Sequence, residues 1–454
     1  MTVQPQASAT AASPRDFLGH PRGLATLAGT ELWERISFHG MVALLTLYMA
    51  EQLLLPGHIE RIVGFEAYRN LLESVTGPLS VEALATQTFG LYIGLIYFTP
   101  VLGGLVGDRV LGRRNAVVLG CGLMTLGHFC MAFDQSFLLA LLLLILGAGF
   151  LRGNLIAQVG ALYDEGDARR SHAIQIYYSM VNIGMFVAPL ITGALGQRYG
   201  WHYGFGFAGF GMLLGLILYA TGAARLPAGQ PTRAAATGAR LAGPERQAVM
   251  ALLLLMPLLT LYWVVNTQEW NAYNLWVRDH VDLSVLGWHM PVAWVQSVNG
   301  LACFALVPVV LLLWRGLAAI GREPDDIGKL TFGCLAMGAF TALDGLSTLV
   351  FRAPHQVPLA WVVFNTLGES FAYLHVQPVA IALFARMAPP SMKAMMIGVY
   401  FLAIFFGGLA SGRLGGFYDH WSATNFWLLH AGVVAAAGLL LPVFGRAVRR
   451  VAAN

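Results

Sequence analysis

The chain has 454 residues, of which 57% are hydrophobic and 11% are charged, and its mean hydropathy is +0.65. Soluble domains contain about 25% charged residues, so this composition argues against a soluble protein and indicates a polytopic membrane protein. The formal net charge of +4 does not indicate nucleic-acid binding, because no polar segment combines clustered basic residues with aromatic ones.

Apolar stretches of about 20 residues, the length that crosses the hydrocarbon core as a helix, recur from the first to the last quarter of the chain. They predict an all-α protein that spans the membrane twelve times. The expected spans are 24–54, 84–106, 114–133, 136–163, 171–197, 203–222, 247–277, 291–315, 327–352, 357–388, 391–415 and 423–446.

The first span contains the sequence TELWERIS, which places Glu31, Glu34 and Arg35 inside the membrane. Residues three and four apart share a helix face, so these side chains form one charged cluster. An ionisable group at the bilayer centre costs about 2.5–3.5 kcal/mol, and such groups therefore face a bundle interior or an aqueous cavity. Because they usually mark ion or substrate pathways, we predict that this cluster is functional.

Basic residues are distributed unevenly between the two sides of the predicted membrane. If the N-terminus is cytoplasmic, the lysines and arginines expected outside are only Arg61, Arg69, Arg198, Arg278, Arg352 and Arg413. This bias follows the positive-inside rule and predicts that both termini are cytoplasmic. The long polar break at 223–246 then predicts a cytoplasmic linker between two six-helix bundles, at 1–222 and 247–454. Two such halves with a site between them are the plan of the major facilitator fold.

The turn between the second and third spans combines glycines with charged residues, namely Gly104, Asp108, Arg109, Gly112 and Arg113. An ordinary positive-inside turn accounts for the arginines but not for Asp108 or for the glycine spacing. The turn resembles the cytoplasmic loop motif of the major facilitator superfamily. We therefore expect these residues to take part in its conformational change.

Further stretches carry a narrower resemblance: Phe17–Leu24, Glu31–Met41, Gly149–Asn154, Tyr177–Gly193, Trp294–Asn299, Leu367–Glu369 and Pro378–Pro389. In this order they resemble the proton-dependent oligopeptide transporters, the POT or PTR family of the major facilitator superfamily. The hallmark of that family is a first-helix Glu-x-x-Glu-Arg followed by two tyrosines and a glycine. The chain is thereby identified as a bacterial member.

The resemblance implies proton-driven uptake of di- and tripeptides, or in some branches of nitrate and other solutes. It implies that Arg35, Tyr97 and Arg152 lie at the carboxylate end of a bound peptide. Arg152 stands where the family usually has lysine, and its guanidinium stays charged and can bind a carboxylate with two hydrogen bonds. Asn182 and Asn299 match positions that hold peptide amino or carbonyl groups, although helix-to-helix hydrogen bonding explains buried amides equally well.

The tenth span has a polar stripe with a four-residue period: Asn365, Glu369, Tyr373 and Gln377. This spacing predicts that the stripe faces the cavity. In the family a glutamate of this helix receives the peptide amino group, and Leu367–Glu369 resembles that site. Alignment through Pro378 instead places Tyr373 at the glutamate position. We expect Glu369 to take part in substrate binding and proton coupling, with helix packing as the alternative role.

A coupling mechanism follows from the charges. With both glutamates ionised, Glu31 and Glu34 balance Arg35 and Arg152, so the empty cluster is neutral. A substrate carboxylate that takes the arginines leaves a glutamate unpaired in a poorly solvated cavity, and this glutamate should accept a proton. Because linkage is reciprocal, the protonated glutamate must in turn favour carboxylate binding.

The first helix also departs from the family. Phe38 and His39 replace its two tyrosines, and Val42 replaces an arginine three residues further on. Carboxylate recognition is therefore weaker here or is achieved differently. His39 is a candidate binding residue because imidazole titrates near neutral pH, but a buried histidine more often has a structural partner.

An enzyme is not indicated, because the sequence has no phosphate-binding glycine loop, metal-ligand cluster or nucleophile array, and we expect no cofactor. The expected partners are di- and tripeptides, protons and the lipid bilayer, with the monomer as the functional form. Helical spans predict a bacterial inner membrane. Three alternatives remain: a proton-coupled carrier of a non-peptide anion, a drug/proton antiporter, or a receptor that binds peptide without moving it.

Overall fold

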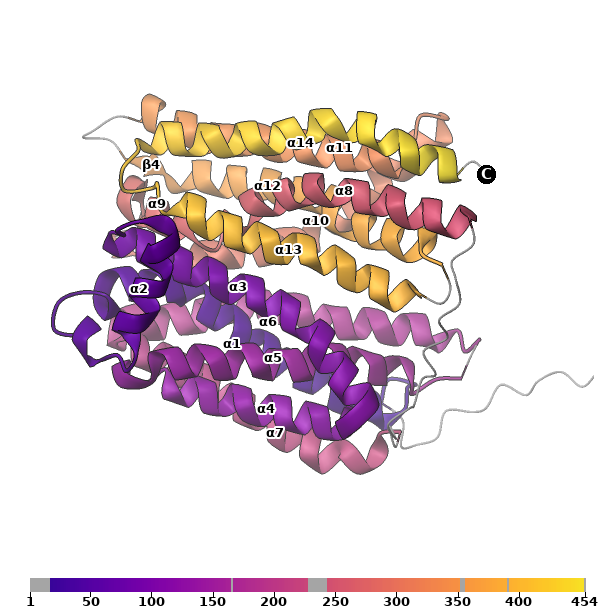
Figure 1. Ribbon diagram of the computed structural model, residues 1–454, viewed down its shortest axis with the longest axis horizontal. Helices are drawn as coiled ribbons and strands as arrows, with labels where there is room; N and C mark the ends of the chain where they lie inside the picture. The colour runs from indigo at the N-terminus through magenta and orange to yellow at the C-terminus, as the bar shows by residue number, and fades with distance from the viewer. Residues whose placement is uncertain (1–16, 165, 228–242, 352–355, 390–391, 453–454) are drawn as a thin grey trace, which may run out of the picture.

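A computed structural model describes residues 17–164, 166–227, 243–351, 356–389 and 392–452. Its long helices run roughly parallel and form two adjacent groups, one from each part of the sequence (Figure 1). Each group contains six long helices in the described part of the chain. This arrangement confirms the predicted all-α, twelve-helix membrane fold.

The N-terminal group buries α1 among its neighbours. Its long helices are α1 (Arg22–Tyr48), α3 (Val81–Val106), α4 (Arg113–Cys130), α5 (Phe137–Gly160), α6 (Arg169–Tyr199) and α7 (Trp201–Gly222). α1 packs against α6 and α7, while α5 packs against α3 and α4. α1 is therefore enclosed by protein, which is what its charged residues require.

The C-terminal group repeats this plan with α8 (Gly243–Gln268), α10 (Trp294–Ala319), α11 (Asp326–Val350), α12 (Leu359–Met387), α13 (Lys393–Gly415) and α14 (Ala423–Ala452). α12 packs against α10 and α11, and α14 packs against α8 and α11. The two groups meet where α3 packs against α13 and α6 packs against α10. The predicted linker at 223–246 stays a prediction, because residues 228–242 lie outside the described residues.

Shorter elements gather at one end of the bundle, the left end in Figure 1, where α2 (Phe65–Thr76) and α9 (Ala272–His280) lie. Two small sheets accompany them: β1 (Val281–Asp282) pairs in parallel with β4 (Val357–Pro358), and β2 (Ser284–Val285) pairs with β3 (Trp288–His289). We call this the outer end, after the topology expected from the basic residues. The sequence analysis did not predict α2.

Hydropathy and length identify nine of the described helices as candidate membrane spans. The long helices not identified in this way are α1, α4 and α12. They cross the bundle beside helices that do qualify, and α1 owes its lower hydropathy to Glu31, Glu34 and Arg35. Packing inside a group, in place of lipid contact, makes these more polar spans possible.

The expected span 247–277 lies within one candidate span, Gly243–His280, but its helix is interrupted after Gln268 and resumes as α9. The break is fixed by Asn271, whose side chain donates to the Thr86 carbonyl oxygen at 3.1 Å and accepts from Thr46 at 3.3 Å. Both partners belong to the N-terminal group. Such long-range contacts leave no signal in the hydrophobic pattern of the span itself.

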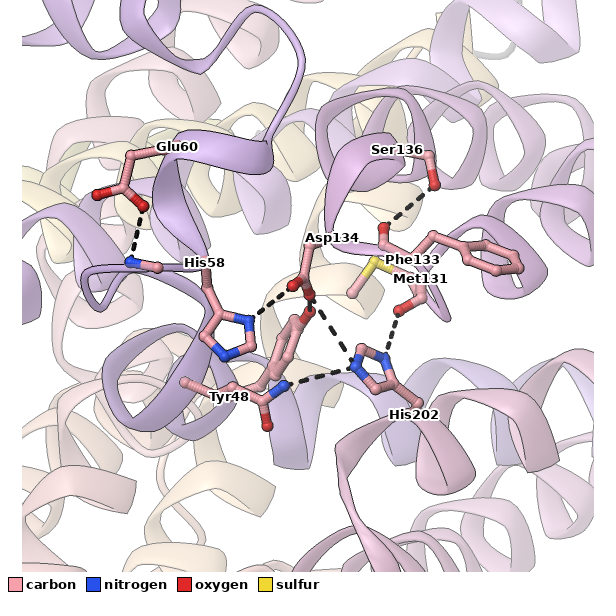
Figure 2. Close-up of polar contacts among 10 residues, drawn as sticks. Tyr48, His58, Glu60, Met131, Phe133, Asp134, Ser136 and His202 are labelled. Carbon is pink, nitrogen blue, oxygen red and sulfur yellow. Dashed lines mark hydrogen bonds and ion pairs between the residues drawn. The ribbon is translucent and has the colours of Figure 1, made fainter.

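A buried carboxylate ties the outer ends of four segments together (Figure 2). Asp134, in the short helix Asp134–Ser136 between α4 and α5, accepts hydrogen bonds from the Tyr48 hydroxyl at 3.0 Å and from His58 Nδ1 at 2.7 Å. Nε2 of His202, at the start of α7, lies 4.0 Å from Asp134 Oδ1, the oxygen that also accepts from Tyr48. Asp134 thus anchors the end of α1 at the point where it turns into the π-helical segment Met49–Leu53.

Replacing this carboxylate should destabilise the bundle. Asp134→Ala leaves the buried Tyr48 hydroxyl without its acceptor, and an unsatisfied buried group costs about 1–3 kcal/mol. We expect a lower midpoint of thermal unfolding, measured by tryptophan fluorescence of the purified protein in detergent. Asp164→Ala is the matched control, because Asp164 is exposed. Equal midpoints for the two variants would contradict a structural role of Asp134.

Candidate functional site

Two carboxylates and two guanidinium groups form a closed network at the centre of the N-terminal group. Arg35 Nε lies 2.7 Å from Glu31 Oε1 and 2.9 Å from Glu34 Oε2, and Arg152 Nε lies 3.0 Å from Glu34 Oε1. Glu31 is 1% exposed and Glu34 is fully buried. The network is neutral when every member is ionised. Buried charges are tolerated only when paired in this way.

Three further residues fix the geometry of this network. The Tyr177 hydroxyl, on α6, donates a hydrogen bond to Glu31. The centroid of the Phe38 ring lies 4.1 Å from the Arg152 guanidinium carbon. This cation–π contact helps to position the guanidinium. Gly184 allows α6 to approach, because a Cβ there would come within 2.4 Å of Arg35 Cβ. Sequence analysis gave no role to Tyr177 or Phe38, although Tyr177 opens one of the stretches that carry the resemblance.

One buried donor of the network, Nη2 of Arg152, has no hydrogen-bond partner among the described residues, although Nε of the same group binds Glu34. The Tyr97 ring centroid lies 5.8 Å from this guanidinium. The structure therefore brings Tyr97, Arg152, Arg35 and Glu34 together, and their binding roles stay predictions. An arginine with a free second nitrogen is suited to bind a carboxylate.

His39 lies beside the network but faces the C-terminal group. Its ring centroid is 5.0 Å from that of Phe38 and 6.2 Å from that of Trp270. It lines a cavity of about 10 Å³ together with Trp270, Gln296 and Asn299, which is room for about one water molecule. His39 is thus at the boundary between the two groups, as a binding candidate should be.

The polar stripe of α12 is divided between two environments. Glu369 is 8% exposed and accepts a hydrogen bond from Thr341 of α11 at 3.3 Å. Tyr373 is half-buried and packs against the hydrophobic core of the C-terminal group. Asn299 donates to Ser370, the neighbour of Glu369, at 3.3 Å. Asn182 is half-buried on α6, and the structure does not connect it to this group of residues.

Two carboxylates join Glu369 that the sequence analysis did not select. Glu269, in the break between α8 and α9, and Asp344, on α11, each lie within electrostatic reach of Glu369. Both are buried, at 9% and 0% exposure. We call Glu269, Asp344 and Glu369 the acidic trio. The signal that could have found Asp344 is a lone carboxylate in the middle of an apolar span.

The loop motif closes the turn between α3 and α4 at the inner end. Arg113 Nε lies 2.8 Å from Asp108 Oδ1 across the turn, and Gly112 has φ of +73°, which favours glycine. Gly104 has open space around its Cα, while Arg109 is exposed. The structure thus pairs Asp108 with Arg113 and leaves Arg109 outside the pair.

Polar contacts identified between the two groups of described helices lie at the outer end. Besides Asn271, they include the Glu51–Arg278 ion pair at 3.7 Å and the bond from Trp294 Nε1 to the Leu190 carbonyl oxygen at 3.0 Å. α3 and α13 also touch there: a Cβ on Gly90 would come within 2.5 Å of Gly408 O. The structure is therefore closed at its outer end.

Comparisons with known proteins agree with this geometry. A model described as "POT family" matches residues 114–239 and 235–428. The peptide transporter YePEPT of Yersinia enterocolitica is 27% identical over an alignment of 490 positions that covers 90% of each chain. A di-/tripeptide transporter of Lactococcus lactis subsp. cremoris is 26% identical and covers 86% of this chain and 88% of its own.

A similar fold is seen in solved structures. The crystal structure of a peptide transporter POT in complex with sulfate has a TM-score of 0.82 and 26% identity, with 96% of this chain and 98% of that chain covered. The crystal structure of a POT family transporter in complex with 5-aminolevulinic acid has a TM-score of 0.81 and 24% identity, with 95% and 97% covered. The long helices described above therefore follow a known arrangement over nearly their whole length.

Substitution of Gly90 should open the outer end. In Gly90→Ala the new methyl group would come within 2.5 Å of Gly408 O and 2.6 Å of Gly412 Cα, and backbone atoms cannot rotate away. We expect a longer distance between spin labels at Leu71 and Leu286, which are exposed on α2 and on the loop after α9, measured by double electron–electron resonance.

The control for this measurement is Gly122→Ala, because a Cβ at Gly122 meets no atom within 4 Å. The labels are placed in a background without the four native cysteines. An unchanged distance distribution in Gly90→Ala would show that the α3–α13 contact does not control closure.

Proposed function

The chain belongs to the POT family, and we propose that it imports di- and tripeptides together with protons by alternating access. The observation that carries this proposal is the neutral network of Glu31, Glu34, Arg35 and Arg152 with its free Arg152 nitrogen. The names of the relatives, a peptide transporter and a di-/tripeptide transporter, support the same substrate class.

Substrate binding begins at the arginines. The free Nη2 of Arg152 and the nearby Arg35 offer two positive groups to a peptide carboxylate, and Tyr97 lies against the same guanidinium. Arg152 binds Glu34 through Nε, so a carboxylate that draws Arg152 away weakens the Glu34 pair. Breaking a buried ion pair leaves an uncompensated charge and costs about 3–5 kcal/mol. Protonation of the glutamate removes that cost.

Coupling follows from this exchange. A proton on Glu34 frees Arg152 for the substrate, and a bound substrate in turn favours the proton, because the two binding free energies are linked reciprocally. Glu31 keeps Arg35 in place and is itself held by Tyr177. We assign Glu31, Glu34 and Arg35 to proton coupling, with Glu369 as the partner on the other side of the site.

The other end of the peptide faces the C-terminal group. Glu369, with Asn299 and Ser370 beside it, receives the amino group, and Tyr373 lies one turn further along α12. Asn182 and His39 complete the binding residues from the N-terminal group. Gly104, Asp108, Arg109, Gly112 and Arg113 act in the inner turn that moves when the closed outer end opens.

The basic residues support an orientation with both termini in the cytoplasm of a bacterium and the outer end outside it. The domains are then the bundles at 1–222 and 247–454, joined by the linker at 223–246. The site lies between the halves of one chain, so we propose that the monomer is the functional unit. Closure at the outer end excludes the outward-open state of the transport cycle.

The first test is uptake of radiolabelled dialanine into proteoliposomes with an inward proton gradient and a negative-inside potential. We expect accumulation in the wild type and at least a tenfold loss in Glu34→Gln and Arg35→Ala, because a tenfold change corresponds to only about 1.4 kcal/mol. Glu34→Gln should retain exchange of labelled for unlabelled dialanine, since exchange needs no net proton movement.

Matched controls are Glu66→Gln and Arg61→Ala, which remove exposed charges at the outer end. Accumulation that is independent of the proton gradient would contradict symport. Efflux driven by the gradient would indicate antiport, and binding without accumulation would indicate a receptor. A folded protein that ignores dialanine would carry another anionic solute.

A further inference from the structure

The acidic trio brings three carboxylates together from three segments that are distant in the sequence. Glu269 lies in the break after α8, Asp344 on α11 and Glu369 on α12, and the charge of Glu369 acts on both others. Thr341, which donates to Glu369 at 3.3 Å, is one turn before Asp344 on the same helix. The three side chains therefore share one interior region.

The trio has no cationic partner among the described residues. The groups that act on the three carboxylates are one another and the amide or hydroxyl groups of Asn299, Asn365 and Thr341. The N-terminal network contrasts with this, because it pairs each glutamate with arginine. One half of the site is thus electrically balanced, while the other has an excess of carboxylates.

Polar atoms around the trio are also left without partners. Both carboxylate oxygens of Asp344 and both amide atoms of Asn365 are buried and have no hydrogen-bond partner in the described part of the chain, and the same holds for the Tyr273 hydroxyl. Asn365 and Tyr273 both face Asp344. Buried polar groups are normally satisfied, so these unpaired acceptors and donors together mark a place that is suited to a polar ligand.

A zwitterionic peptide cannot balance the trio. Its carboxylate engages the arginines of the N-terminal group, and its single ammonium group compensates only one carboxylate of the trio. The other carboxylates then need protons or a second cation, because an unpaired buried charge is costly. A basic side chain on the first residue of the peptide would place a second ammonium group beside the first.

We propose that the site prefers peptides whose first residue is basic, such as lysine, with Glu269 and Glu369 binding the two ammonium groups. The proposal rests on the proposed function and names its preferred substrates. Glu269 and Glu369 are the trio members with some exposure, at 9% and 8%. Asn299 reaches both, since its amide faces Glu269 and donates to Ser370 beside Glu369. Asp344, which is fully buried behind them, adds negative potential.

Protons compete with the lysine side chain for the same carboxylates. The other titratable groups that face the trio are Tyr262, Tyr273, Tyr373 and Cys303, which are neutral near pH 7, and His39, which lies beside Trp270. Protonation of a carboxylate removes an attractive charge. This effect weakens the preference for lysine as the pH falls.

The experiment is dialanine exchange in proteoliposomes at equal pH on both sides, with the potential held at zero. The measured quantity is the concentration of Lys-Ala, Ala-Lys, Ala-Ala or 1,5-diaminopentane that halves the exchange. We expect Lys-Ala to act at a roughly tenfold lower concentration than Ala-Ala at pH 7.5, which corresponds to about 1.4 kcal/mol. Ala-Lys should gain nothing, because its side chain lies toward the arginines. The advantage of Lys-Ala should shrink at pH 5.5.

Variants locate the preference within the site. In Glu269→Gln the half-inhibiting concentration of Ala-Ala should exceed that of Lys-Ala by about twofold or less. The matched control Glu66→Gln, at an exposed outer position, should keep the wild-type ratio of the two concentrations. Asp344→Asn should reduce the ratio in part. If Glu269→Gln does not exchange dialanine, the wild-type pH series and Asp344→Asn still test the proposal.

Several results would overturn the proposal. The first is that Lys-Ala and Ala-Ala halve exchange at the same concentration in the wild type, and the second is that Ala-Lys halves it at the same low concentration as Lys-Ala. The third is that the advantage of Lys-Ala over Ala-Ala does not shrink at pH 5.5. The fourth is that diaminopentane inhibits as strongly as Lys-Ala. Each leaves dialanine exchange intact and so leaves the proposed function standing. Failure of the wild type to exchange dialanine at all would instead contradict the proposed function.

Discussion

The pairing of Glu31 and Glu34 with Arg35 and Arg152 allows the first helix to lie inside the membrane at all. The three charges of α1 would oppose insertion of an isolated helix, but pairing with one another and with Arg152 of α5 lowers this cost and fixes the packing of α1 against α5 and α6. Tyr177 and Gly184 bring α6 to the same place. The network thus joins the stability of the N-terminal group to its chemistry, because any ligand that breaks a pair also disturbs the packing.

At the outer end of the molecule, α1 also connects the charged network to the C-terminal group. α1 ends in the π-helical segment Met49–Leu53, which is anchored by Tyr48 to Asp134 and contributes Glu51 to the pair with Arg278. The same helix contributes Thr46 to Asn271, at the break after α8. One helix therefore connects the charged network at its centre with the contacts that close the outer end. A change at the network is well placed to affect closure, since both act on α1.

Much of the fold could be predicted because its signals are local. Twelve apolar stretches gave twelve long helices, and the order of short motifs gave the family. The cluster on α1 was found because residues three and four apart must share a helix face. The break after Gln268 was missed because it depends on Asn271 bonding to Thr86, and the acidic trio was missed because Glu269, Asp344 and Glu369 meet only in space. Hydrophobic periodicity contains no information on such contacts between segments that are distant in the sequence. The roles of the individual site residues stay predictions.

The two sides of the site differ in a way that neither side shows alone. In the N-terminal group each carboxylate has a guanidinium, and the unused Arg152 nitrogen leaves that side attractive to an anion. In the C-terminal group the acidic trio has no cationic partner among the described residues, so that side is attractive to cations. A peptide has one charge of each sign, separated by the length of its backbone. Under the proposed function, electrostatic complementarity gives the peptide a single favourable direction, with its carboxylate toward α5 and its amine toward α12. Proton coupling then follows at both ends from the same physical rule, which is that a buried charge needs either a partner or a proton.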